Sequence, residues 1–304
     1  MFFHVKQLQY HAKPERPDPV FARRLQEVLG GQWGEMSVMN AYLFQGWNCR
    51  GPQKYKDMIL DIGTEEIAHV EMLATMIAQL VEGAPISTQE RMVSDNPAVG
   101  AVMGGMDPQD YIVAGMGAMP SDSNGNRWTA AYIVSSGNLL ADFRFNVTAE
   151  SQGRLQVCRL YEMTDDPGVR DMLGFLIARD RMHQNQWLAA IAELEQDGLD
   201  ATPVPSVFPR EREPEPFTYQ FWNASQGTES QQGHWASGPS MDGQGEFQYV
   251  AQPQPQGEVP QLSIADPRLF GTAKNPLQEE LGGSGLVSKA AQAVEGIVHG
   301  DGGS

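Results

Sequence analysis

The stretch Glu66-Ile67-Ala68-His69 and its counterpart Asp180-Arg181-Met182-His183 decide the fold of this 304-residue chain. In each, a carboxylate lies three residues before a histidine, and the second stretch follows 114 residues after the first (66 to 180, 69 to 183). A lone glutamate precedes each stretch, Glu35 before the first and Glu150 before the second. Residues three apart on a helix lie on one face, so this carboxylate and imidazole reach the same point. Two such helices, with two more that each supply a glutamate, form the site of dimetal carboxylate four-helix bundles.

Apolar residues at helical spacing surround both stretches and aim them at the core. Glu66 and His69 share a stripe with isoleucine, leucine and methionine at steps of three and four, and the second copy repeats the pattern. The plain alternative is a set of buried polar residues that satisfy one another. It would place four carboxylates in one core, with no lysine or arginine on the same stripes other than Arg154. The carboxylates would then repel one another strongly. Bound metal ions remove that repulsion, so we interpret the residues as metal ligands.

The composition indicates one main domain with an added segment. Hydrophobic residues make up 41% of the chain, enough for a sizeable core. The formal net charge of −17 argues against nucleic acid and anionic membranes as partners. Two cysteines, Cys49 and Cys158, are too few for a disulfide framework, and no run of 18 apolar residues or signal peptide occurs. We therefore expect a cytoplasmic, unprocessed protein.

Helical periodicity dominates the chain up to about residue 200. The pattern predicts four long helices, at residues 18–46, 52–82, 128–163 and 167–196. The segment between the second and third is long enough for a crossover connection rather than a tight turn. We expect an all-α four-helix bundle with the dimetal site over residues 1–200. Residues 201–304 are rich in proline, glycine and glutamine, which predicts an extended, loop-rich tail.

Carboxylates with one imidazole per metal suit manganese or iron rather than zinc or copper, and ligand type does not separate the first two. A resemblance goes further. The stretches that carry it are Glu35-Met36-Ser37, Gly63 to Glu71, Ala114 to Ala118 and Asp122 to Trp128. They resemble the manganese catalases, non-haem enzymes of the ferritin-like superfamily. The likeness runs from Met1 to about residue 270 and includes loops as well as ligands, so it implies a ferritin-like bundle.

The resemblance implies two manganese ions per subunit. Carried over residue by residue, Glu35 and His69 hold one ion, Glu150 and His183 hold the other, and Glu66 bridges both. The implied activity is disproportionation of hydrogen peroxide to water and dioxygen, with the metal pair cycling between Mn(II)2 and Mn(III)2.

Each half-reaction moves protons, so a carboxylate near the metals is required as acid and base. Asp180 is the candidate, although related enzymes carry glutamate there; the shorter side chain either acts through a water or leaves the relay to another route. Ala149 stands where some members have an arginine. Tyr42 matches a tyrosine that orients the first-helix glutamate, and its plain interpretation is a core aromatic.

A calcium site is also implied for some members of the family. Asp57 and Asp61 lie four apart on the second predicted helix, where the plain interpretation is a solvated acidic face. In those members a tail segment joins the aspartates around calcium, and here Asn223, Ser225 and Gly227 match it. Carboxylate, amide, hydroxyl and carbonyl oxygens are the ligands that calcium takes.

The resemblance further implies a homohexamer in which the tail wraps neighbouring subunits. Two other classes of function stay open at the level of sequence. One is a di-iron oxidase or peroxidase, although the paired CxxC motifs of a rubrerythrin do not occur. The other is a metal-binding structural or coat protein, against which the intact ligand set argues. The metal loaded in the cell cannot be read from ligand type.

Overall fold

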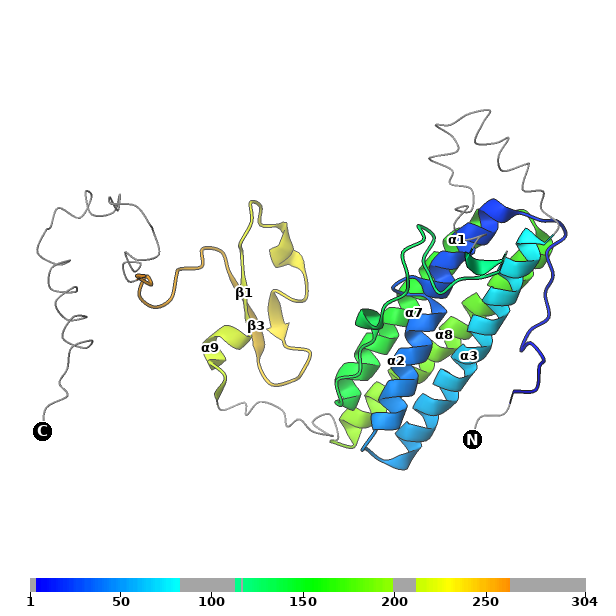
Figure 1. The fold of residues 1–304 in the computed structure, drawn as a ribbon. Helices are drawn as coiled ribbons and strands as arrows, with labels where there is room; N and C mark the ends of the chain where they lie inside the picture. Colours follow the sequence, from blue (N-terminus) through cyan, green and yellow to red (C-terminus); the bar gives the residue numbers. More distant parts are fainter. Residues whose placement is uncertain (1–3, 83–112, 116, 199–211, 263–304) are drawn as a thin grey trace, which may run out of the picture. The chain divides into compact units, whose positions relative to one another are not determined.

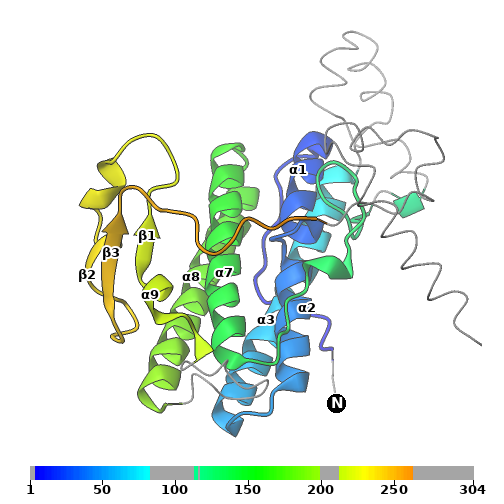
Figure 2. The ribbon, with the colours of Figure 1, turned by 90° about the vertical axis from the view of Figure 1, so that its left-hand side faces the viewer.

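Four long helices lie side by side in the first of two compact units of this computed structural model (Figures 1 and 2). They are α2 (Glu35–Asn48), α3 (Gln53–Val81), α7 (Leu139–Glu162) and α8 (Pro167–Gln196). Helix α2 packs along α3, and α7 packs along α8. The structure describes residues 4–82, 113–115, 117–198 and 212–262, so most of the predicted crossover lies outside the described part. The predicted four-helix bundle is confirmed, and none of its described helices is long and apolar enough to cross a membrane.

The first predicted helix, 18–46, is wrong as a single element. The chain forms α1 (Pro19–Gly30), breaks, and begins α2 at Glu35. Gly31 has an extended backbone with φ −72° and ψ 176°, and Gly34 is extended at the position before α2. Glycine in a helix interior costs about 1 kcal/mol relative to alanine, so closely spaced glycines favour a break. Glu35 therefore opens a helix, where the backbone dipole stabilises a negative charge.

The third helix begins at residue 139 rather than at the predicted 128. Asn138 caps it, because its side-chain oxygen accepts a hydrogen bond from the N–H of Ala141 at 2.9 Å. Gly137 just before it has a positive φ of 81°, which a helix does not allow. Between residues 128 and 138, all of which the structure describes, the chain holds only the short 3-10 turn η1 (Ala130–Tyr132). The asparagine cap is a local signal that apolar periodicity alone passes over.

The second and fourth helices lie within one residue of their predicted ranges, 52–82 and 167–196. At the start of α8, Pro167 occupies the first turn, where its missing N–H costs nothing. The carboxylate of Asp166 accepts hydrogen bonds from the N–H groups of Gly168 and Val169 at 3.0 and 3.1 Å. These caps fix the register of the helix that carries the second stretch.

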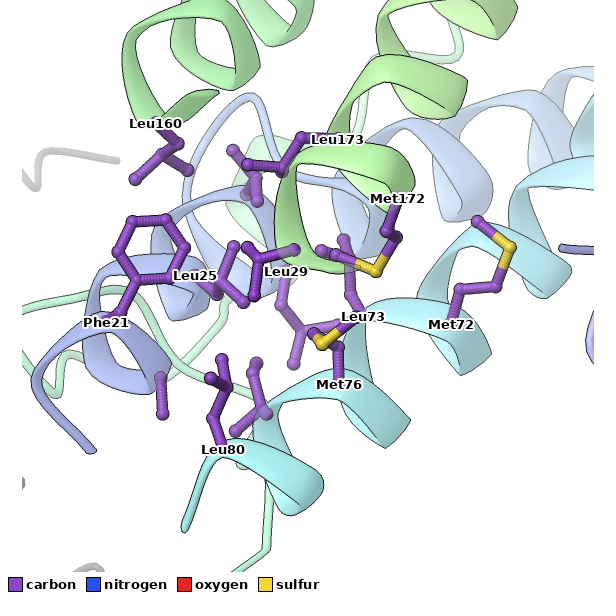
Figure 3. Close-up of a cluster of buried hydrophobic side chains, with 14 of the residues drawn as sticks. Phe21, Leu25, Leu29, Met72, Leu73, Met76, Leu80, Leu160, Met172 and Leu173 are labelled. Carbon is purple, nitrogen blue, oxygen red and sulfur yellow. The ribbon is translucent and has the colours of Figure 1, made fainter. Parts of the chain in front are cut away.

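Two buried apolar clusters fill the bundle, one on each side of a polar layer. Figure 3 shows the first, in which side chains from α1, α3, α7 and α8 point toward one another. Its labelled members are Phe21, Leu25, Leu29, Met72, Leu73, Met76, Leu80, Leu160, Met172 and Leu173. The second includes Tyr42, Tyr55, Ile59, Phe143, Trp187 and Leu194. Along α3 the two clusters are separated by Glu66 and His69, and along α8 by Asp180 and His183.

The second unit, Glu213–Ser304, contains a small sheet that the sequence does not predict. Its strands are β1 (Gln220–Trp222), β2 (Ser237–Pro239) and β3 (Glu246–Val250), in the order β1-β3-β2. Strand β1 pairs with β3 in parallel, and β2 pairs with β3 antiparallel. The unit also contains two short helices, α9 (Glu215–Thr218) and the 3-10 helix η3 (Glu229–Gln232). The sequence predicts an extended, loop-rich tail but not these strands, because strands of three to five residues are too short to give a clear alternating pattern. The last part of the tail, 263–304, lies outside the described residues.

Loss of the Leu25 side chain should destabilise the bundle strongly. Leu25 has no exposed surface, and it belongs to the cluster that joins α1 to α3 and α8. We expect Leu25→Ala to lower the free energy of unfolding by about 2–5 kcal/mol, measured by denaturant titration. The control is Leu188→Ala on α8, whose side chain is 48% exposed and should cost far less. Equal costs for both variants would contradict the assigned core.

Candidate metal centre

Each of the four long helices brings at least one ligand-type side chain to the polar layer. Glu35 is the first residue of α2, Glu66 and His69 lie midway along α3, Glu150 lies midway along α7 and His183 midway along α8. All five are buried, and both histidines are completely so. The structure therefore brings together all five residues that the sequence singles out as candidate manganese ligands.

Glu66 lies at the centre of this arrangement. Glu35, Glu66 and His69 can bring one ligand atom each within 4.8 Å of one another, and Glu66, Glu150 and His183 can do the same. The two oxygens of Glu66 face different imidazoles, with Oε2 2.6 Å from Nδ1 of His69 and Oε1 2.7 Å from Nδ1 of His183. The two rings lie 5.6 Å apart and nearly parallel. One carboxylate thus belongs to two possible three-ligand metal sites.

The close contacts at Glu66 are not hydrogen bonds. Glu66 Oε2, His69 Nδ1 and His183 Nδ1 are buried atoms that lack a hydrogen-bond partner among the described residues, as is Asp180 Oδ2. Buried polar atoms are almost always paired, because an unpaired one costs about 1–3 kcal/mol. Metal ions bound between these nitrogens and oxygens would satisfy them, and carboxylate-rich sets with one imidazole per ion suit manganese or iron. The residues present therefore fit a pair of such ions.

Burial and mutual charge shift the pKa values of the centre. Burial, reinforced by the charge of Glu66, raises the pKa of Glu35 to about 7 and that of Glu150 to about 8. Burial lowers the pKa of His183, but the carboxylates of Glu66 and Glu65 outweigh this effect and raise it to about 10. Without metal, these groups hold protons near neutral pH, and divalent cations would take their place.

Asp180 shares the polar layer but belongs to neither three-ligand group. It lies one turn before His183 on α8 and is 4% exposed. Burial, with repulsion from Glu35 and Glu150, raises its pKa well above the usual range. Such a carboxyl group can hold a proton beside the centre without being a ligand.

Tyr42 contacts a different glutamate from the one predicted. Its hydroxyl donates a hydrogen bond to Glu150 Oε1 at 2.6 Å, so the prediction that it orients Glu35 is wrong. Glu35 lies seven residues earlier on α2, about 10 Å along the axis, whereas Glu150 reaches across from α7. The ring is fully buried against Trp187, with centroids 5.0 Å apart. Tyr42 thus connects α2 to a candidate ligand on α7.

The sequence reasoning missed Glu65, which lies on the outer side of both imidazoles. Its Oε2 is 3.0 Å from Nε2 of His183, and its Oε1 is 3.7 Å from Nε2 of His69. Burial raises the pKa of Glu65, but hydrogen bonds with His183 and Arg179, together with the nearby ring of His69, outweigh it and hold that pKa well below the usual range. Its place four residues before His69 was a usable signal, since residues four apart on a helix are neighbours.

The residues of the implied calcium site fall in different units. Asp57 and Asp61 are exposed on α3, and Asp57 Oδ1 accepts a hydrogen bond from Gln53 at 2.6 Å. The other three belong to the second unit: Asn223, Ser225 and Gly227.

Within the second unit, the side-chain oxygen of Asn223 faces only acceptors. Turning the amide over would let its nitrogen donate to the main-chain oxygens of Ser225 and Gly227 at 2.9 and 3.2 Å. Gly227 has a φ of 106°, a backbone conformation that favours glycine. The turned amide would therefore hold both main-chain oxygens of this turn.

The chain matches known proteins over most of its length. The family model described as manganese containing catalase matches residues 1–284. The uncharacterized protein YjqC of Bacillus subtilis is 60% identical over 272 residues, which cover 90% of this chain and 98% of that protein. A manganese catalase of Bacillus subtilis is 56% identical over the same shares of both chains. The structure of KatB, a manganese catalase from Anabaena, superposes with a TM-score of 0.64 at 28% identity, covering 83% of this chain and all of that one.

Metal uptake by the metal-free protein should depend steeply on pH. The raised pKa values of Glu35, Glu150 and His183 mean that these groups carry protons at pH 6, and those protons leave progressively as the pH rises. Divalent metal must displace them, so affinity should rise by at least about tenfold per pH unit between pH 6 and 8. Calorimetry in two buffers of different ionisation enthalpy would count the released protons. A flat affinity with no proton release would contradict the assigned centre.

Proposed function

Because the chain belongs to the manganese-containing catalase family, we propose that its five converging ligand-type residues hold two manganese ions. The protein is a non-haem manganese catalase, and it disproportionates hydrogen peroxide to water and dioxygen. In our proposal Glu35 and His69 bind one ion, Glu150 and His183 bind the other, and Glu66 binds both. The observation that carries the proposal is the shared position of Glu66, whose two oxygens face the Nδ1 atoms of different imidazoles at 2.6 and 2.7 Å.

The manganese pair supplies, when bound, a redox couple that cycles between Mn(II)2 and Mn(III)2 and moves two electrons in each half-reaction. The protein's part is to hold the ligands and limit water. The apolar clusters on either side of the polar layer leave the ligands at most 6% exposed. The Tyr42 hydroxyl holds one oxygen of Glu150, which fixes the direction in which that carboxylate presents its lone pairs.

We propose that Asp180 moves the protons that accompany the two half-reactions. It is buried beside the ligands, its Oδ2 has no hydrogen-bond partner among the described residues, and its carboxyl pKa is raised. A positioned group with a proton to give and regain contributes about 10²–10⁴-fold to rate. The aspartate is one methylene shorter than glutamate, so it stands back from the candidate metal positions rather than joining them.

Calcium is the second cofactor that we propose. The support is chemical: Asp57 and Asp61 offer carboxylate oxygens on an exposed helix face, and the segment at Asn223, Ser225 and Gly227 offers an amide side chain and main-chain oxygens. Carboxylate, amide and main-chain oxygens are ligand types that calcium takes. We further propose a homohexamer whose tails wrap neighbouring subunits, to be tested by light scattering for six times the mass of one chain.

A cytoplasmic location completes the proposal. Its support is the state of the two cysteines, Cys49 and Cys158, which are both free. Free thiols are typical of a reducing compartment. Fractionation of the native host, with the protein followed by antibody, would test this location.

The direct test combines elemental analysis with oxygen release. Protein from its native host should contain about two manganese ions per chain, should contain calcium, and should evolve dioxygen from peroxide in the presence of cyanide or azide. His183→Ala removes one candidate ligand and should lose one manganese and nearly all activity, because a two-electron step needs both ions. The control is His11→Ala, an exposed histidine outside the bundle. Two irons without oxygen release, or full metal content and turnover in His183→Ala, would contradict the proposal.

Asp180→Asn separates proton transfer from metal binding. Asparagine keeps the shape of the side chain but cannot release a proton, so we expect normal manganese content with turnover reduced about 10²–10⁴-fold. Asp171→Asn is the matched control, an exposed carboxylate on the same helix that accepts a hydrogen bond from Tyr10. Turnover within twofold of wild type in Asp180→Asn would assign the proton relay elsewhere.

A further inference from the structure

We propose that Glu65 is a positioning residue for the histidine ligands, one carboxylate that fixes the orientation of His183 and faces His69. The inference rests on the proposed ligand set. It concerns the outer face of the centre, where each imidazole presents Nε2 while its Nδ1 faces Glu66. A histidine ligand needs a partner on its second ring nitrogen, because that partner fixes the tautomer and the ring orientation.

The contacts of Glu65 differ between its two oxygens. Oε2 lies 3.0 Å from Nε2 of His183, within hydrogen-bond distance. Oε1 lies 3.7 Å from Nε2 of His69, too far for a hydrogen bond, and that nitrogen has no other partner among the described residues. The carboxylate of Glu65 therefore contacts the ring of His183 directly and faces the ring of His69 at a longer distance.

Arg179 and Gln9 hold Glu65 itself in place. Nε and an Nη of Arg179 donate to the two oxygens of Glu65 at 2.6 and 3.0 Å, a bidentate pair. Gln9, from the segment that precedes α1, donates to Oε1 at 2.8 Å. A carboxylate fixed by donors on two separate segments has little freedom to turn, so the ring that it contacts has little freedom as well.

A plain Arg179–Glu65 ion pair is the competing explanation, since half-buried ion pairs often have no further role. Two observations favour the positioning role. The oxygen that accepts from Arg179 Nη also contacts His183, and the side chain of Glu65 is only 18% exposed. An anionic partner on Nε2 makes Nδ1 a stronger ligand for a metal cation. It therefore favours manganese binding and stabilises Mn(III) relative to Mn(II).

Glu65→Gln tests the inference, because glutamine keeps the length of the side chain and removes its charge. Manganese titration of the metal-free variant should show at least one of two binding steps weakened roughly 10–100-fold. The reduction potential of the loaded variant should shift upward, a change that loss of packing alone would not give. Glu71→Gln is the matched control on α3, whose carboxylate pairs with His4 at 2.9 Å and does not contact a candidate ligand.

Arg179→Gln keeps the experiment decisive if the first variant does not fold. It leaves the carboxylate beside His183 but removes two of its donors, so weakening should follow in the same direction and to a smaller extent. The inference would be overturned if both variants bound manganese with constants within twofold of those of wild type and of Glu71→Gln, and if their reduction potentials did not change. That outcome would leave the proposed ligand set intact. Fewer than two manganese ions in the wild type would overturn that ligand set and the inference with it.

Discussion

The rest of the bundle depends on one electrostatic constraint, the burial of four carboxylates around two imidazoles with no lysine or arginine among the buried residues that the structure describes. Glu35, Glu66, Glu150 and Asp180 are each at most 6% exposed. Four ionised carboxylates at this depth would cost a prohibitive amount of free energy. In the metal-free centre the raised pKa values of Glu35 and Glu150 keep protons on these two groups. The arrangement fits a site for cations, because bound metal would let every carboxylate ionise and be satisfied at once.

The fold places this layer by surrounding it with apolar contacts. Along α3 the chain passes from Ile59 and Ile62 through Glu66 and His69 to Leu73, so the ligands sit between two buried clusters. Packed apolar side chains on both sides fix the helices that carry the ligands, and they limit the water that would weaken each charge interaction. The stability of the bundle and the precision of the centre therefore come from the same contacts.

Sequence reasoning recovers what is periodic and misses what is local. The spacing of Glu66 and His69, repeated at Asp180 and His183, is enough to predict the bundle, because helix geometry alone brings such pairs to one face. The break after Gly30 is missed because apolar periodicity alone passes over it, although the closely spaced glycines at Gly30, Gly31 and Gly34 are a local signal for a break. Contacts between helices, such as that of Tyr42 with Glu150, depend on packing that no single-helix pattern contains.

The two copies of the motif differ at the carboxylate. Glu66 reaches both imidazoles, whereas the equivalent residue of the second copy, Asp180, is one methylene shorter and belongs to neither three-ligand group. The residues just before them, Glu65 and Arg179, are equivalent too, and they bond to each other through opposite charges. A symmetric bundle thus acquires an asymmetric centre, in which one carboxylate is shared between the two three-ligand groups and the other belongs to neither.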